Sequence, residues 1–151
     1  IFSLLQERDR RVVLHRSDTN RTRQTLELSL WGLSGIEYEL KIPHQDIGEI
    51  DMWDMTWKPI DIEVFRGVLS SVHRRFPNWE CRKDVWNRMK RYMRSLEGNT
   101  IHVIFSHGVA ISSIVHEILW DYDEKIRLAN ASMSHLRMDW SGSHEILSLG
   151  E

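Results

Sequence analysis

The stretch around His107 constrains the fold more than any other part of the sequence. An apolar run at 101–105 predicts a buried strand, and a second apolar run at 111–120 predicts a helix. Ser106, His107 and Gly108 lie between them. A strand that leads directly into a helix is the repeating unit of α/β folds, which bind ligands at the carboxyl ends of their strands. The sequence therefore predicts a histidine beside a helix N-terminus, where anions such as phosphate bind favourably.

Helix and strand patterns alternate along most of the chain. Strands are predicted at 11–14, 38–42, 101–105, 133–140 and 145–149, and helices at 22–31, 62–76, 85–96 and 111–119. Residues 1–8 read as the end of a helix, and 43–60 as an irregular loop rich in aromatic residues. We expect one domain over 1–151. Its predicted class is α/β, a three-layer α/β/α sandwich with a mostly parallel sheet and a hairpin near its end.

Composition narrows the classes of function. The 151 residues are enough for one core, and 41% hydrophobic with 28% charged residues is typical of a soluble globular domain. The net charge of -2 gives no electrostatic reason to expect binding to nucleic acid or to an anionic membrane. Cys81 is the single cysteine, so an internal disulfide is excluded and a reducing compartment such as the cytoplasm is expected.

Two arginines stand where a predicted strand gives way to a predicted helix. In the segment 17–25, Arg21 and Arg23 could direct planar guanidinium groups at an oxyanion, helped by the backbone N–H groups of the helix N-terminus. Taken alone, the same pattern also fits a polar loop with solvated arginines, because exposed arginines are common.

Glu49 is the candidate general acid. It lies among Ile47, Ile50 and Trp53, and such apolar surroundings can raise the pKa of a carboxyl group. An ordinary surface carboxylate is the alternative. The eight histidines are scattered without the spacing of a metal site, so neither a metal nor another cofactor is expected.

The order of these clusters resembles the histidine phosphatase (phosphoglycerate mutase-like) superfamily. That family has a Ser-x-x-x-Arg-[Ala/Thr]-x-Gln-Thr segment, a hydrophobic-x-Glu segment before a tryptophan loop, a strand ending in Ser-His-Gly, and often a late Asn-x-Ser. The matching positions in this sequence are Ser17, Arg21, Thr22, Gln24, Thr25, Ile47, Glu49, Trp53, Ser106, His107, Gly108, Asn130 and Ser132. The resemblance covers nearly the whole chain.

The resemblance implies phosphomonoester hydrolysis through a phosphohistidine. Arg21 would bind the phosphoryl oxygens together with Gly108 and Val109, and His107 would donate to those oxygens in the transition state. Glu49 would protonate the leaving oxygen and then activate water. These roles suit phosphoryl transfer, which depends on positioning and positive charge. The expected partner is a phosphorylated small molecule or a phosphoprotein.

The family's nucleophile motif, Arg-His-Gly on a first strand, does not occur in these residues. The sequence reads as beginning inside the first helix, which favours a partial record of a longer protein over a natural loss of the motif. The residues around Trp53 also lack the family's glycines, which leaves the acid role of Glu49 open. The rival interpretation is a catalytically inactive domain that binds a phosphorylated ligand, or a protein partner through its aromatic loop at 52–57. The sequence does not identify the substrate, and it does not distinguish phosphatase from mutase activity. It also leaves the oligomeric state open, and a homodimer is one possibility.

Overall fold

The computed structural model describes residues 11–50, 66–67, 79–119, 126, 128–139 and 143–150. The chain divides into two compact units, the first formed by 1–48 and 88–107 and the second by 49–87 and 108–151. Both contain helices and strands, and the first contains a parallel sheet, which confirms the predicted α/β class. Within the described ranges, no helix combines the length and the apolar character needed to cross a bilayer.

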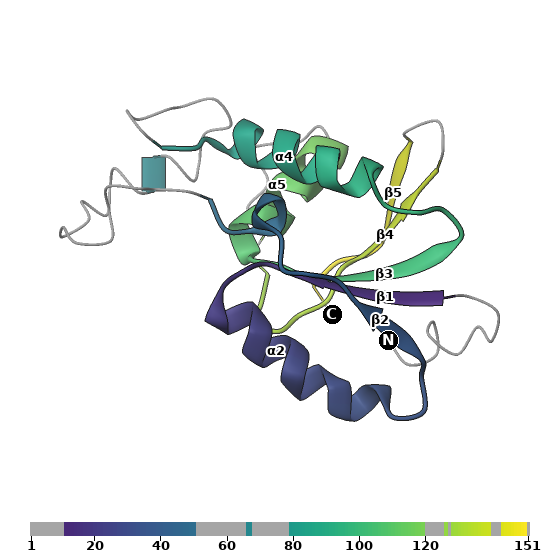
Figure 1. The fold of residues 1–151 in the computed structure, drawn as a ribbon. Coiled ribbons are helices and arrows are strands. Elements are labelled where there is room, and N and C mark those ends of the chain that lie inside the picture. Colours follow the sequence, from purple (N-terminus) through teal and green to yellow (C-terminus); the bar gives the residue numbers. More distant parts are fainter. Residues whose placement is uncertain are drawn as a thin grey trace. The chain divides into compact units, whose positions relative to one another are not determined.

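The first unit is built on three parallel strands. β1 (Arg11–Arg16) lies between β2 (Tyr38–Leu40) and β3 (Thr100–Phe105) (Figure 1). Every residue of β1 from Val12 to His15 is buried. A continuous buried run of this kind is typical of the central strand of a parallel sheet, which is covered on both faces.

One face of this sheet carries helix α2 (Asn20–Leu30), followed by the short helix η1 (Trp31–Leu33). Thr19 caps α2 by accepting a hydrogen bond from the backbone N–H of Thr22. Gly35, at φ +85°, allows the tight turn back to β2. The core on this face consists of buried Val12, Leu14, Leu26 and Leu33, with Leu30, Ile36, Ile101, Val103 and Phe105 packed against them.

Helix α4 (Arg82–Arg94) spans both units, and its second half belongs to the first. Its buried side chains Val85, Met89 and Met93 follow the spacing that predicted a helix here. The short helix η2 (Gln45–Ile47) also belongs to the first unit and buries Ile47. The amphipathic pattern in the sequence therefore located α4 correctly.

The second unit contains α5 (Gly108–Leu119) and the antiparallel pair β4 (His135–Met138) and β5 (His144–Ser148). Helix α5 buries Ala110, Ile114 and Val115. The first turn of α4 binds it through polar side chains: Arg82 Nη2 donates to Ser112 Oγ at 2.8 Å, and Lys83 forms an ion pair with Glu117.

The predicted elements differ from the observed ones mainly at their ends. The strand predicted at 38–42 is assigned only over Tyr38–Leu40, and the strand predicted at 133–140 only over His135–Met138. The structure describes too little of the predicted 62–76 helix to test it, although Arg66 and Gly67 are helical. Residues 1–8, the aromatic loop at 52–57 and the hairpin turn at 141–142 lie outside the described residues. The single-domain expectation stays a prediction.

Candidate functional site

Ser17 and His107 lie just after the carboxyl ends of the neighbouring parallel strands β1 and β3. β1 pairs in register with β3 as far as Arg16 opposite Phe105, and Ser17 N then donates to Phe105 O at 3.1 Å. Ser17 Oγ lies 2.9 Å from His107 Nε2, and both residues are buried. Two side chains 90 positions apart in the sequence are thus joined because parallel strands end together.

A cluster of hydroxyl groups surrounds this contact. Ser17 Oγ lies 2.8 Å from Thr22 Oγ1 and 3.2 Å from Thr19 Oγ1. Thr22 Oγ1 also donates to the backbone oxygens of Ser17 and Thr19, at 3.1 and 3.0 Å. Since Thr19 and Thr22 belong to the cap and first turn of α2, the start of this helix fixes the hydroxyl that orients the His107 ring.

Burial and positive charge both act on His107. Burial lowers its pKa most, the guanidinium groups of Arg21 and Arg88 lower it further, and the carboxylate of Asp18 opposes them. Together these effects favour the neutral imidazole in the free protein. A bound anion would reverse the balance, because negative charge stabilises the protonated imidazole.

Arg21 supplies exposed positive charge at the start of α2. It is exposed, and it lies in a first turn without acidic residues, so the positive end of the helix dipole adds to its charge. An exposed guanidinium whose charge acts on a nearby histidine suits the binding of an oxyanion. The sequence predicted both Arg21 and His107, and the structure places them in the same unit, close enough for the charge of Arg21 to act on His107.

The backbone that leads to Glu49 is held by Arg88. Nη1 of this arginine donates to Asp46 O at 2.7 Å and to Gly48 O at 3.1 Å, with Gln45 O at 3.5 Å. Ser106 Oγ adds a fourth hydrogen bond to the same turn, donated to Ile47 O at 2.7 Å. The polypeptide is therefore fixed up to the residue before Glu49.

Glu49 itself begins the second unit, where its Oε1 accepts a hydrogen bond from Ile50 N at 3.0 Å. Gly108 and Val109 form the first turn of α5 in that unit, and Val109 O accepts from the hydroxyls of Ser112 and Ser113. Convergence of these three residues on Arg21 and His107 stays a prediction.

Asn130 and Ser132, the last matched segment, also lie in the second unit. Asn130 is in a turn, and Ser132 N donates to Ala129 O at 3.2 Å. These contacts assign the pair no role beyond shaping the chain before β4.

Sequence reasoning missed Arg88. From the sequence alone, an arginine on an amphipathic helix is expected to be exposed to solvent, but Arg88 is buried. Its position next to Met89, on the apolar side of α4, is a signal that could have identified it. It also missed Thr19, which caps α2 and lies 3.4 Å from His107 Nε2.

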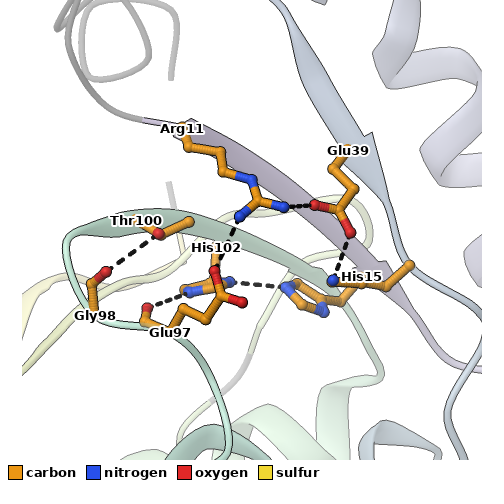
Figure 2. A network of polar contacts seen from close by, with 8 residues as sticks. Arg11, His15, Glu39, Glu97, Gly98, Thr100 and His102 are labelled. Atoms are coloured by element: carbon orange, nitrogen blue, oxygen red, sulfur yellow. Dashed lines mark hydrogen bonds and ion pairs between the residues drawn. The ribbon is translucent and has the colours of Figure 1, made fainter.

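A second polar network lies in the first unit and joins all three strands. His15 is at its centre: Nδ1 lies 2.8 Å from Tyr92 Oη, and Nε2 lies 2.8 Å from Nδ1 of His102. His102 Nε2 in turn donates to Glu97 O at 2.9 Å (Figure 2). The carbonyl of Glu97 can only accept, so Nε2 of His102 carries a proton. When both rings are neutral, Nδ1 of His102 then accepts from Nε2 of His15, and Nδ1 of His15 accepts from the Tyr92 hydroxyl.

Comparison with known proteins is consistent with this geometry. The model of the histidine phosphatase superfamily (branch 1) matches residues 2–149. A mycobacterial glucosyl-3-phosphoglycerate phosphatase in complex with inorganic phosphate aligns over 100% of this chain and 80% of its own, with 17% identity and a TM-score of 0.73. The same phosphatase with VO3 aligns over 98% and 80%, with 16% identity and a TM-score of 0.70. A mycobacterial hydrolase 2 aligns over 98% and 73%, with 16% identity and a TM-score of 0.65. No curated protein matches the sequence significantly.

Proposed function

The chain belongs to branch 1 of the histidine phosphatase superfamily, and from this premise we propose that it carries the phosphate-binding residues of a phosphomonoester hydrolase. The observation that carries the proposal is the contact of Ser17 Oγ with His107 Nε2 at 2.9 Å, at a ring on which the charge of Arg21 acts. The phosphate and VO3 complexes of a phosphatase with this fold support the same ligand class for this chain. The substrate is a phosphorylated small molecule or a phosphoprotein.

In this proposal Arg21 and His107 bind the phosphoryl oxygens. The dianion raises the affinity of His107 for a proton, so the ring donates to an oxygen while negative charge builds up in the transition state. Backbone N–H groups of Gly108 and Val109, in the first turn of α5, add further donors. Glu49 protonates the leaving oxygen and then activates the attacking water.

The attacking group must be a further histidine. No Arg-His-Gly triplet occurs in the 151 residues, so this proposal assigns the attacking group to no residue of the sequence. The second candidate function is a domain that binds phosphorylated ligands without turnover, for which Arg21 and His107 would suffice. The two functions share the Arg21–His107 site and differ only in whether a phosphorus–oxygen bond is broken.

Two arginines on α2 provide a matched test. Arg21→Ala removes the proposed ligand of the oxyanion, while Arg23→Ala removes an exposed arginine whose guanidinium pairs with Glu27 at 3.5 Å. With the intact protein and p-nitrophenyl phosphate, we expect Arg21→Ala and His107→Ala to lower kcat/KM by about 100-fold or more. Arg23→Ala should stay within about twofold of the wild type.

The outcomes separate the two functions. Turnover that depends on Arg21 and His107 supports the hydrolase. Phosphate binding in calorimetry that depends on both residues, without turnover, supports the binding domain. Binding and turnover unaffected by either substitution would overturn both, because the site would then lie elsewhere.

A further inference from the structure

Two side chains hold every carbonyl oxygen of the turn 45–48, which comes directly before Glu49. Nη1 of Arg88 donates to three of them, those of Gln45 at 3.5 Å, Asp46 at 2.7 Å and Gly48 at 3.1 Å. The fourth, that of Ile47, accepts from Ser106 Oγ at 2.7 Å. Arg88, Ser106 and the turn all belong to the first unit. The backbone of the turn therefore has one fixed path.

Packing alone does not explain an arginine in this place. Arg88 is 8% exposed and lies on the same helix as the buried Val85 and Met89. Removing a guanidinium group from water costs free energy that only good polar partners offset. A methionine would fill the space at a lower cost. What the guanidinium adds is a rigid, planar set of donors, which fixes the directions of the carbonyl groups that it binds.

Both donors are also close to His107. Ser106 precedes it in the chain, and the charge of Arg88 is one of the causes that lower the pKa of His107. The turn before Glu49 and the surroundings of the phosphate-binding histidine therefore depend on the same two side chains.

The carboxyl group of Glu49 follows the backbone that carries it. Its Oε1 accepts from the backbone N–H of Ile50 at 3.0 Å, so the side chain is tied to the chain directly after the turn. A shift of the backbone at Gly48 would therefore move the carboxyl group with it. A displacement of about 1 Å in a reacting group can lower a rate by about 100-fold.

We propose that Arg88, together with Ser106, is a positioning residue for Glu49 and acts by fixing the carbonyl groups of the turn 45–48. The inference rests on the proposed function. There the Glu49 carboxyl gives its proton to the leaving oxygen, while the phosphorus–oxygen bond breaks and its electron pair passes to that oxygen. Loss of Arg88 should therefore matter most for substrates whose leaving group needs a proton.

Two aromatic substrates separate this role from general damage. p-Nitrophenyl phosphate releases an anion that the nitro group stabilises, so it leaves without a proton. Phenyl phosphate releases a more basic phenolate, with a pKa of about 10 like that of tyrosine, and depends on the acid. The ratio of the two kcat/KM values, measured on one preparation, does not depend on the fraction of folded protein. A loss of positive charge near His107 changes both values by a similar factor.

With the intact protein, we expect Glu49→Gln to lower the ratio of phenyl to p-nitrophenyl phosphate turnover by about 100-fold. Arg88→Met should lower it by about tenfold or more, and Ser106→Ala by about threefold. In the Glu49→Gln background, Arg88→Met should leave the ratio unchanged, because the acid that it positions is gone. The matched control is Arg91→Met, which removes an exposed arginine of the same helix and should keep the wild-type ratio.

The outcomes distinguish this inference from the proposed function. A ratio that falls in Arg88→Met, but falls no further in the Glu49→Gln background, supports the positioning role; if Arg88→Met does not fold, Ser106→Ala decides in the same way. A wild-type ratio in both variants, or an equal fall in the Glu49→Gln background, overturns the inference alone. A wild type without turnover, or an unchanged ratio in Glu49→Gln, overturns the proposed acid and the inference with it.

Discussion

His15 is a residue whose protonation opposes folding. It lies buried between Tyr92 and His102, and burial, the charge of His102 and the charge of Lys41 lower its pKa to about 4. The unfolded chain has the ordinary histidine pKa of 6.5 and therefore binds the proton first as the pH falls. The stability that neutral His15 contributes is thus complete above pH 6.5 and is lost as the pH falls toward 4.

This sign leads to a prediction for His15→Gln, which cannot titrate. Between pH 7 and pH 5 the free energy of unfolding of the wild type should fall by about 2 kcal/mol more than that of the variant. Urea unfolding at the two pH values measures the difference. The same loss in both proteins would mean that the buried imidazole takes up its proton as readily as an exposed one.

Arg88 is a second residue whose role only the structure reveals. We predict that Arg88→Met lowers the free energy of unfolding by about 2–3 kcal/mol, because the oxygens of Asp46 and Gly48 lose a charged donor in a buried turn. Arg91→Met is the matched control: its side chain is 68% exposed and its Nη2 lies 3.9 Å from Asp46 Oδ1, so its loss should cost less than about 0.5 kcal/mol. Equal losses in urea unfolding would contradict the assignment of Arg88 as the residue that holds this turn.

At the scale of elements, the turn formed by η2 sets where the chain leaves the first unit. A Cβ atom added to Gly48 would lie 2.9 Å from the backbone oxygen of Gln45. Backbone cannot move aside as a flexible side chain does, so we predict that Gly48→Ala lowers the free energy of unfolding by about 1–3 kcal/mol.

A glycine in open space provides the comparison. A Cβ atom added to Gly108 would meet nothing within 4 Å, and Gly108 does not have a positive φ. Gly108→Ala at the start of α5 should therefore change the free energy of unfolding by less than about 0.5 kcal/mol. Thermal and urea unfolding of the two variants test the contrast, and a neutral Gly48→Ala would show that the turn is less tightly packed than described.

At the scale of the whole molecule, much of the fold could be predicted from hydrophobic periodicity in the sequence. The buried run at Val12–Leu14 and the 3.6-residue spacing of Val85, Met89 and Met93 depend only on local periodicity, so β1 and α4 were predicted near their observed positions. Ends of elements were less predictable. The assigned β2 ends at Leu40, although Ile42 continues the alternation, because Pro43 interrupts the ladder shortly after.

The site was only partly predictable, because some of its contacts join residues that are far apart in the sequence. Arg21 and His107 follow strand ends, and parallel topology brings strand ends together, so their proximity could be inferred. The contact between His15 and His102 spans 87 positions, and neither histidine stands in a motif. Such a pair depends on the register of β1 with β3, which periodicity does not reveal.

The central claim is that His107 and Arg21 form an oxyanion site, and the pKa of His107 tests it most directly. Nitrogen-15 NMR of the imidazole should give a pKa below the ordinary 6.5 in the free protein. Saturating phosphate should raise it in the wild type and in Arg23→Ala, but much less in Arg21→Ala. A His107 pKa that phosphate leaves unchanged in the wild type would contradict the account.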